Sequence, residues 1–264
     1  MNLTSPSQVK AWCIGEGFHP NRAMGQNFLI DRNALEAIVD AGLEGAEAPQ
    51  RVLEIGPGLG VVTEELLARG CEVTAVEKDP ALAGRLHRAL GSPARLTVVE
   101  ADALVWLARG GGAGFDRMVS NLPYQSGTRM LLEIVTRRLV PSITVLVQAE
   151  VAERLSAGPG SKKRGLAGVW AQLDYDVRIV RKVAAGCFWP RPEVGSCVVR
   201  LDRHDRNAAL DARERGIFRR LTKTAFEHRR KQLGSIFKDL IQSRARAEEL
   251  SNDEWIKTVK GLAV

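Results

Sequence analysis

The stretch RVLEIGPGLG, Arg51 to Gly60, decides the fold of this 264-residue chain. Its first five residues form a short apolar run typical of a strand. Val61 to Ala68 then reads as a helix with Leu66 and Leu67 on its apolar face. A strand, a glycine-rich turn and a helix form the opening unit of a doubly wound nucleotide-binding fold, in which glycines let the backbone approach a ligand. The sequence therefore predicts an α/β fold.

The glycine spacing in this turn bears on which cofactor the fold would hold. The pattern is G-x-G-x-G, because Val61 and not glycine follows Gly60. Pro57 removes a backbone donor that a pyrophosphate would use. Taken alone this loop is a weak signal, but it favours an adenosine cofactor without phosphates over NAD.

Acidic side chains follow the next two predicted strands. Residues 71–76 read as a strand that ends at Glu77, about 20 positions after Gly56, where an acidic side chain can accept from ribose hydroxyls. Residues 96–99 read as another strand and lead to Asp102, which could accept from an adenine amine. Asp102 could equally be a helix N-cap, because residues 104–108 look helical, and both roles can hold together.

A fourth predicted strand, residues 117–120, leads into Asn121-Leu122-Pro123-Tyr124. The Asn121 Oδ1 atom and the Leu122 carbonyl are two acceptors that suit the N–H groups of an exocyclic base amine. Pro123 favours an extended Leu122 and adds no competing N–H, and Tyr124 offers a face for base stacking. A strand end followed by a proline turn would also explain the tetrapeptide.

These four strand ends should meet at one edge of the sheet. In open α/β sheets the ligand crevice lies outside the carboxyl ends of the strands. Gly56, Glu77, Asp102 and Asn121 each follow or close a predicted strand. Packing alone explains such a coincidence poorly, so we expect one binding site there.

At this point the motifs resemble those of a known family, the S-adenosylmethionine-dependent rRNA adenine N6-dimethyltransferases of the KsgA type, which act on small-subunit rRNA. The resemblance runs from about position 23 to about 233 and implies a Rossmann-like methyltransferase domain with a small helical C-terminal domain. The matching segments are GQNFL (25–29), VLEIGPGLG (52–60), NLPY (121–124), VQAEVAERL (147–155), FWPRPEV (188–194) and AFEHRRK (225–231).

The resemblance implies roles for particular residues. Asn27 and Leu29 would close over the cofactor, while Tyr124 and Phe188 would sandwich the target base. Asn121 and Leu122 would hold the target amine and would be the catalytic residues together with the two aromatic rings. The expected cofactor-binding residues are Asn27, Leu29, Gly56, Gly58, Glu77, Asp102 and Asn121.

The chain departs from the family pattern at three places. Residues 125–128 read QSGT where NIST is more usual, and Gly195 stands where aspartate is usual. Residues 161–168 lack the tyrosine typical of that stretch and contain no serine after Ser161. The departures fall on the substrate side and bear on the target and on the number of methyl groups, not on the cofactor.

Bulk composition indicates a cytoplasmic protein. The four cysteines have no CxxC spacing, as expected of free thiols in a reducing compartment. The four histidines are scattered, which predicts no metal site. The sequence has no apolar run of about 18 residues and no signal-peptide pattern at its start, so we expect no membrane partner. We expect a monomer.

Positive charge is concentrated near the C-terminal end of the sequence. The chain has a net charge of +7, and residues 201–264 hold 15 Lys/Arg against 10 Asp/Glu. Residues 213–231 carry most of the excess positive charge, and their apolar residues have a helical spacing. The charged side of such a helix could be an ordinary solvated face. Beside a base-modifying domain, contact with the RNA backbone is the favoured interpretation. Lys162, Lys163 and Arg164 are expected near the RNA path. The expected RNA-binding residues are Arg219, Arg220, Arg229, Arg230 and Lys231.

We therefore expect a methyltransferase domain over residues 1–200, with an N-terminal arm over 1–30, and a small helical, basic, RNA-contacting domain over 201–264. The expected partner is rRNA of the small-subunit precursor, and the expected cofactor is S-adenosylmethionine. Two alternatives stay open: adenine methylation of large-subunit rRNA or another RNA, and an RNA-binding assembly factor with weak or lost catalysis. A dehydrogenase is less consistent with the sequence, because Pro57 lacks the backbone N–H that a pyrophosphate would use.

Overall fold

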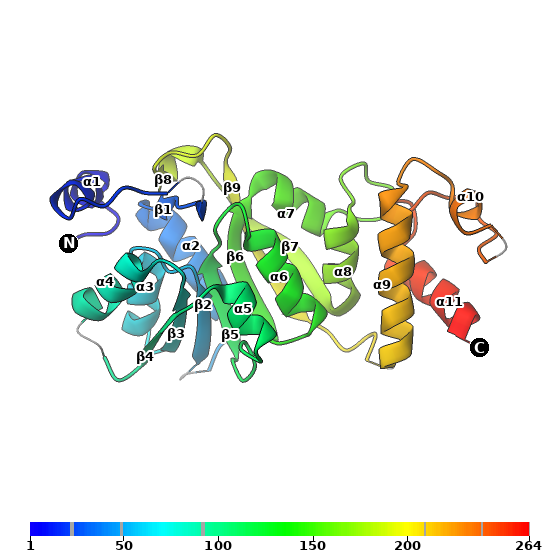
Figure 1. Cartoon of the computed structure of the whole chain (residues 1–264), viewed down its shortest axis with the longest axis horizontal. Coiled ribbons are helices and arrows are strands. Elements are labelled where there is room, and N and C mark those ends of the chain that lie inside the picture. The colour runs from blue at the N-terminus through cyan, green and yellow to red at the C-terminus, as the bar shows by residue number, and fades with distance from the viewer. Residues whose placement is uncertain (22–23, 48–49, 91–92, 209, 239, 264) are drawn as a thin grey trace. The chain divides into compact units, whose positions relative to one another are not determined.

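The computed structural model describes residues 1–21, 24–47, 50–90, 93–208, 210–238 and 240–263 (Figure 1). The chain divides into two compact units. The larger unit comprises Met1–Ala152 and Arg178–Asp202, and the smaller unit comprises Glu153–Val177 and Arg203–Val264. This division differs from the single domain boundary expected near residue 200, because residues 153–177 group with the C-terminal segment.

The larger unit contains a mostly parallel sheet whose strands alternate with helices along the chain. Its helices are α1 (Pro6–Gly15), α2 (Arg32–Leu43), α3 (Val61–Ala68), α4 (Pro80–Leu90), α5 (Ala103–Ala108) and α6 (Gly127–Thr136). Its strands are β1 (Phe28–Leu29), β2 (Arg51–Ile55), β3 (Glu72–Glu77), β4 (Leu96–Glu100), β5 (Arg117–Asn121), β6 (Ser142–Gln148), β8 (Phe188–Trp189) and β9 (Ser196–Arg203). Helix α7 (Ala149–Ser156) and strand β7 (Tyr175–Val183) run across the division between the units.

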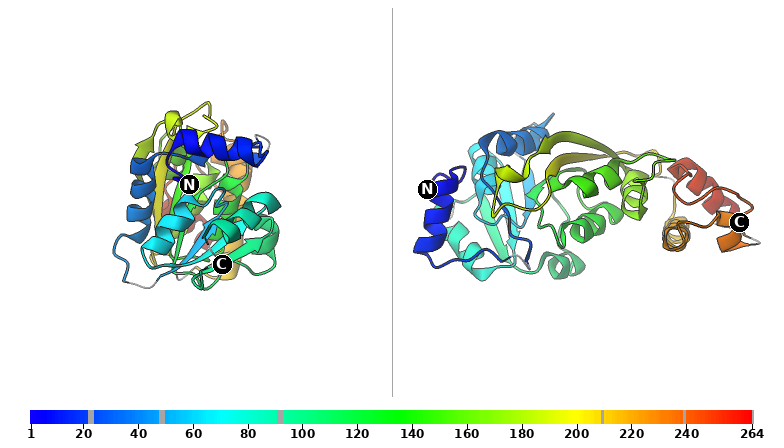
Figure 2. Two further views of the ribbon diagram at one scale, coloured as in Figure 1. Left: turned by 90° about the vertical axis from the view of Figure 1, so that its left-hand side faces the viewer. Right: turned by 90° about the horizontal axis from the view of Figure 1, so that it is seen from above.

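The strand order of the main sheet places its switch point at the predicted site. The order is β4-β3-β2-β5-β6-β9-β7, with β2 parallel to both β3 and β5, and β9 antiparallel to β6. The chain therefore runs outward from β2 on one side and then returns to build the other side from β5. Such a reversal opens a crevice at the carboxyl ends of the two central strands. Helices α2 and α6 cover opposite faces of the sheet (Figure 2).

Most of the elements expected from the sequence are confirmed. Strand β2 and helix α3 have the predicted bounds, and β3, β4 and β5 begin or end within a residue of the prediction. The sequence also predicts late strands at 177–183 and 195–201, which correspond to β7 and β9. The Phe188 segment between them pairs with β1 in a separate two-stranded sheet.

The N-terminal arm holds more structure than its sequence suggested. Residues Pro6–Gly15 form helix α1, with Val9 and Cys13 buried. Proline at the first helical position suits the helix start, because its missing N–H would have no helical partner there. The arm is therefore an ordered part of the larger unit's core and not only a lead-in to α2.

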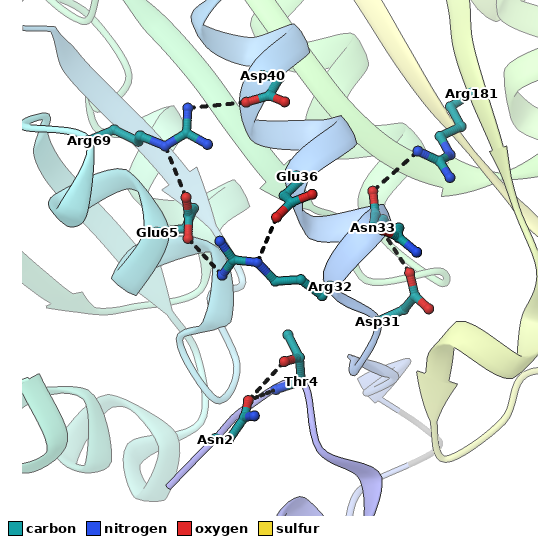
Figure 3. A network of polar contacts seen from close by, with 11 residues as sticks. Asn2, Thr4, Asp31, Arg32, Asn33, Glu36, Asp40, Glu65, Arg69 and Arg181 are labelled. Carbon is teal, nitrogen blue, oxygen red and sulfur yellow. Dashed lines mark hydrogen bonds and ion pairs between the residues drawn. The ribbon is translucent and has the colours of Figure 1, made fainter.

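Helix α2 is fixed by its cap and by charges on its exposed side (Figure 3). The Asp31 side chain accepts a hydrogen bond from the backbone N–H of Ala34 at 2.8 Å, as an N-cap does. Glu65 on α3 accepts from Arg32 and, through its other oxygen, from Arg69, both at 3.0 Å. Exposed ion pairs contribute little individually, so burial of the apolar face of α2 dominates its packing.

The smaller unit is helical. It contains α8 (Leu166–Asp174), α9 (Ala212–Glu227), α10 (Leu233–Phe237) and α11 (Asn252–Ala263) around a core with Phe218 and Trp255 fully buried. Asp211 begins α9 through a capping box with Glu214. Apolar residues of the helical pattern, such as Phe218 and Leu221, pack inward, but α9 ends at Glu227. Arg229, Arg230 and Lys231 therefore lie in the turn that follows, not on the helix.

Candidate active site

A cavity of about 360 Å³ lies where the sequence predicted a site, at the carboxyl ends of the central strands. This volume falls in the usual range for small-molecule sites. All of the expected cofactor-binding residues and Leu122 line it: Asn27, Leu29, Gly56, Gly58, Glu77, Asp102, Asn121 and Leu122. Tyr124 and Phe188 are not among the lining residues.

The glycine-rich turn brings bare backbone to the cavity wall. Gly56 and Gly58 have φ values of +67° and +57°, a region that L side chains rarely adopt. A Cβ atom at Gly58 would lie 3.1 Å from the Phe28 ring, and one at Gly56 would lie 3.3 Å from Pro123 Cδ. Both positions therefore require glycine for conformation as well as for space.

Glu77 is held at the end of β3 by the backbone of the glycine-rich turn. Its Oε2 accepts from the Gly58 N–H at 3.1 Å, and its Oε1 accepts from the Asp79 N–H at 2.9 Å. The side chain is buried, and burial raises the pKa of its carboxyl although the backbone donors oppose that shift. The carboxylate can accept about four hydrogen bonds, so it keeps acceptor capacity for a ligand hydroxyl.

Glu54 is a lining residue that the sequence reasoning missed. It lies in β2, is buried, and accepts a hydrogen bond from Thr63 Oγ1 at 2.6 Å. Burial raises the pKa of its carboxyl to about 8, and the negative charge of Glu77 adds to the shift. The available signal was a charged residue inside an otherwise apolar strand run.

Asp102 is confirmed as a helix N-cap. Its Oδ1 accepts from the Leu104 N–H at 2.9 Å at the start of α5, and its Oδ2 pairs with Lys78 Nζ at 2.9 Å. The lysine holds the pKa of this carboxyl below its usual range. Because Asp102 also lines the cavity, the capping role leaves its expected ligand role open.

Two acceptors at the end of β5 lack protein partners. Asn121 Nδ2 donates to the backbone oxygen of Asn27 at 3.1 Å, which leaves Oδ1 as the free end of the amide. Within the described residues, the buried Oδ1 atom has no hydrogen-bond partner, and neither does the Leu122 carbonyl oxygen. Buried polar atoms are normally paired, so an unpaired one at a cavity wall indicates a ligand donor.

The two aromatic rings expected to sandwich a base touch each other instead. Tyr124 and Phe188 have ring centroids 6.3 Å apart and an interplanar angle of 69°, an edge-to-face contact. Phe188 is buried, and the Tyr124 hydroxyl hydrogen-bonds the Ser196 hydroxyl at 2.6 Å. The rings are neighbours, as predicted, but they are not parallel walls of an open slot.

The basic residues expected to bind RNA differ in their exposure. Arg220, Arg230 and Lys231 are exposed, whereas Arg219 and Arg229 are half-buried. Arg229 donates to the backbone oxygen of Lys162 and pairs with Glu248 at 3.6 Å. Lys162 and Lys163 are exposed, but Arg164 is only 1% exposed and so is not the surface cation that its sequence context suggested.

Two features of the described residues concern partners other than RNA. No helix among them combines the length and hydropathy needed to cross a membrane. They also contain no group of three or more His, Cys, Asp or Glu side chains placed to hold a metal ion.

Solved structures with the same fold include a dimethyladenosine transferase and an rRNA methyltransferase. A dimethyladenosine transferase from Plasmodium falciparum superposes with a TM-score of 0.74 at 21% identity, covering 88% of this chain and 96% of that chain. The 23S rRNA methyltransferase ErmE superposes with a TM-score of 0.67 at 23% identity, covering 90% of this chain and all of that one. At these identities the likeness establishes the fold, a Rossmann-like methyltransferase architecture.

Curated relatives are closer in sequence. Ribosomal RNA small subunit methyltransferase A of Deinococcus radiodurans is 45% identical over 200 residues, 76% of this chain and 67% of the relative. The protein of that name from Chlamydia felis is 35% identical and covers 100% of this chain and 97% of the relative. The one from Mycobacterium bovis is 38% identical over 98% of this chain and 88% of the relative.

The family model described as ribosomal RNA adenine dimethylase matches residues 17–260. This match spans both compact units and includes the cavity, the turn after β5 and the basic segment. The chain therefore belongs to the ribosomal RNA adenine dimethylase family, whose members are methyltransferases.

Proposed function

We propose that this protein transfers methyl groups from S-adenosylmethionine to N6 of adenines in small-subunit rRNA, ending in dimethyladenosine. The observation that carries the proposal is the pair of unpartnered acceptors, Asn121 Oδ1 and the Leu122 carbonyl, at the wall of a cavity in a family of rRNA adenine dimethylases. The relatives named as small subunit methyltransferases favour that subunit as the source of the target. An enzyme of this kind would work in the cytoplasm.

The residues of the cavity fit S-adenosylmethionine by charge. Its wall carries two buried carboxyl groups, Glu54 and Glu77, whose pKa values are raised by burial. A cationic ligand would favour their ionised forms, whereas a pyrophosphate would be repelled by them. S-adenosylmethionine carries a sulfonium and an ammonium group and supplies an electrophilic methyl group.

Six residues of the cavity would hold the adenosine and methionine parts. Glu77 would accept from the ribose hydroxyls, and Asp102 would accept from the adenine amine while it caps α5. Gly56 and Gly58 would allow close approach of the methionine part to the backbone. Asn27 and Leu29 would close the cavity from the N-terminal side, since both line it.

The turn after β5 would orient the target amine. Asn121 Oδ1 and the Leu122 carbonyl would accept its two N–H groups and so favour the pyramidal nitrogen that attacks. The nitrogen becomes cationic as the methyl arrives, and fixed acceptors stabilise that developing charge without reorganising. No strong general base is required, because the proton leaves an already cationic nitrogen. The protein's main contributions are positioning and exclusion of water.

The target adenine must leave its stack to reach this turn. Tyr124 and Phe188 would then support the base, with Tyr124 or Phe188 turning from its present edge-to-face contact. Arg219, Arg220, Arg229, Arg230 and Lys231 would contact phosphates and position the RNA without reading its sequence. Arg220, Arg230 and Lys231 are the better placed of these because they are exposed.

The proposal is tested by incubating the full chain with isotope-labelled S-adenosylmethionine and small ribosomal subunits that lack adenine methylation. Nucleoside mass spectrometry should find labelled N6,N6-dimethyladenosine in the small-subunit rRNA and none in large subunits treated in the same way. Label confined to large-subunit rRNA would indicate that the enzyme methylates adenines of that subunit instead. Binding of subunits without any label transfer would indicate an assembly factor without catalysis.

A further inference from the structure

A second cavity, of about 410 Å³, lies entirely within the smaller unit, and none of its lining residues takes part in the site described above. Its walls come from the segments on either side of α8, from residues 204–207 and from the start of α11. The lining is mainly polar. It includes one buried cation, Arg164, and one histidine, His204.

Arg164 is buried without a counter-charge. Its Nη1 donates to the Ala157 carbonyl at 2.9 Å and to Gln172 Oε1 at 3.0 Å, and its Nη2 donates to Asn252 Oδ1 at 3.0 Å. All three acceptors are neutral. In the part of the chain that the structure describes, no carboxylate pairs with this guanidinium and its Nε–H has no acceptor.

Such an arrangement is costly unless something else compensates the charge. Burial of an unpaired cation is strongly unfavourable in a protein interior. Desolvation accordingly lowers the pKa of Arg164. The three neutral acceptors orient the guanidinium but do not neutralise it, so the cavity keeps one uncompensated positive charge in its wall.

One other group at the cavity suits an anion. Both ring nitrogens of His204 are buried and have no hydrogen-bond partner among the described residues, so the ring can offer an N–H in either tautomer. The cavity also takes in Asn252 and Asp253 at the start of α11, but this helix end is already capped: Ser251 Oγ accepts from the Glu254 N–H at 3.2 Å, and the Glu254 carboxylate accepts from the Ser251 N–H at 2.7 Å.

Two carboxylates line the cavity as well. Asp176 is paired with Arg206, and both side chains are exposed. Asp253 is exposed in the first turn of α11. Charge in water is screened far better than charge in the interior, so neither carboxylate compensates Arg164.

We propose that this cavity binds a phosphate group through Arg164 and His204. The Nε–H and one N–H of Nη2 share an edge of the planar guanidinium, which is the geometry that accepts two oxygens of a phosphate side by side. The phosphate could belong to an RNA backbone or be a free ion, and both sources use the same contacts. The site is separate from the proposed methyl transfer and does not depend on it.

The first test measures thermal unfolding of the full chain in sodium phosphate and in sodium chloride of equal ionic strength and pH. The wild type should show a saturable rise of the midpoint in phosphate only. Arg164→Gln should weaken the apparent phosphate affinity about tenfold or more, the scale of a lost charged hydrogen bond. Arg244→Gln is the matched control, because it removes an exposed arginine of the same unit outside the cavity, and it should keep the response.

A second variant keeps the test decisive if Arg164→Gln fails to fold. His204→Phe preserves a ring of similar size but removes both nitrogens, and it should also weaken the phosphate response. A short single-stranded RNA then separates the sources. If RNA suppresses the response to inorganic phosphate in the wild type, the ligand is a backbone phosphate, and if it does not, the ligand is a free ion. A wild type without a phosphate-specific rise, or variants that respond like the wild type, would overturn the proposal.

Discussion

Asn121 and Asn27, far apart in the sequence, are joined by a hydrogen bond from the Asn121 amide nitrogen to the Asn27 backbone oxygen at 3.1 Å. This bond fixes which end of the Asn121 amide faces the cavity. It also ties the N-terminal segment to the turn after β5, where a Cβ atom on Gly25 would lie only 3.0 Å from the Tyr124 backbone nitrogen. The cofactor side and the proposed base side of the site therefore share one wall.

Glu77→Ala should weaken S-adenosylmethionine binding by roughly 1.5–3 kcal/mol, because it removes a charge-assisted acceptor for the ribose. Titration calorimetry measures this directly. Asp116→Ala, which removes a carboxylate just before β5, at the amino ends of the strands, is the control and should bind normally. NAD should bind neither protein, and micromolar NAD binding would refute the reading of the glycine-rich turn.

Glu54 should make the free protein less stable as pH rises. Its pKa is about 8 in the folded chain against an ordinary value of 4.5, so the stabilising effect of its neutral form is complete below 4.5 and is lost by about pH 8. Glu54→Gln should remove this dependence. At about 1.4 kcal/mol per pKa unit, the stability of the variant relative to wild type should change by on the order of 5 kcal/mol between pH 4.5 and pH 8.

Denaturant unfolding at several pH values gives that difference. Glu100→Gln, at an exposed position at the end of β4, serves as the control and should leave the pH dependence as it is in the wild type. If the free energy of unfolding depends on pH in the same way for wild type and Glu54→Gln, Glu54 is ionised in the folded protein.

Tyr124→Ala should reduce kcat/KM for the RNA by an amount equivalent to about 1–3 kcal/mol, the usual worth of one base–aromatic stack. Tyr124→Phe keeps the ring and loses only the hydrogen bond to Ser196, so it should retain most of the activity. Steady-state kinetics on methylation-free small subunits distinguish the two. Equal losses in both variants would assign the role to the hydroxyl and not to the ring.

Replacing Arg220 and Arg230 together with glutamine should lower RNA affinity and flatten its salt dependence. Each lost phosphate contact should reduce the log–log slope by about 0.7–0.9. A double variant of Arg88 and Arg109, exposed arginines of the larger unit, removes the same charge elsewhere and should leave the slope nearly unchanged. Identical slopes in all three proteins would leave the smaller unit without an RNA contact at these positions.

The sequence predicted the strands and their ends well, because β2 to β5 are short apolar runs with glycine or polar residues directly after them. Glu54 was missed because a strand's periodicity does not show that one charged residue faces a cavity. Helix α1 was missed because its apolar residues do not form one face: Val9 and Cys13 are buried, whereas Ile14 is exposed. The position of α1 depends on contacts with residues distant in the sequence, such as Arg85, whose guanidinium lies 5.0 Å from the Trp12 ring centre.

The basic segment shows a different limit of sequence reasoning. Charge counting identified the smaller unit as the basic part of the chain, but it treated each cation as equivalent. Arg164 proved buried and Arg229 proved engaged with Glu248, since the long arginine side chain can reach inward to neutral or acidic acceptors. Only the tertiary structure separates such residues from exposed ones such as Arg220.

The role of Asn121 is tested most directly by the single-turnover rate of Asn121→Ala at saturating S-adenosylmethionine and methylation-free small subunits. We expect a loss of about a hundredfold or more, the scale for removal of a preorganised acceptor in a transition state, with cofactor affinity falling much less. Asn33→Ala, at an exposed position on α2, should react at the wild-type rate. A near-normal rate for Asn121→Ala would contradict the role given to the turn after β5.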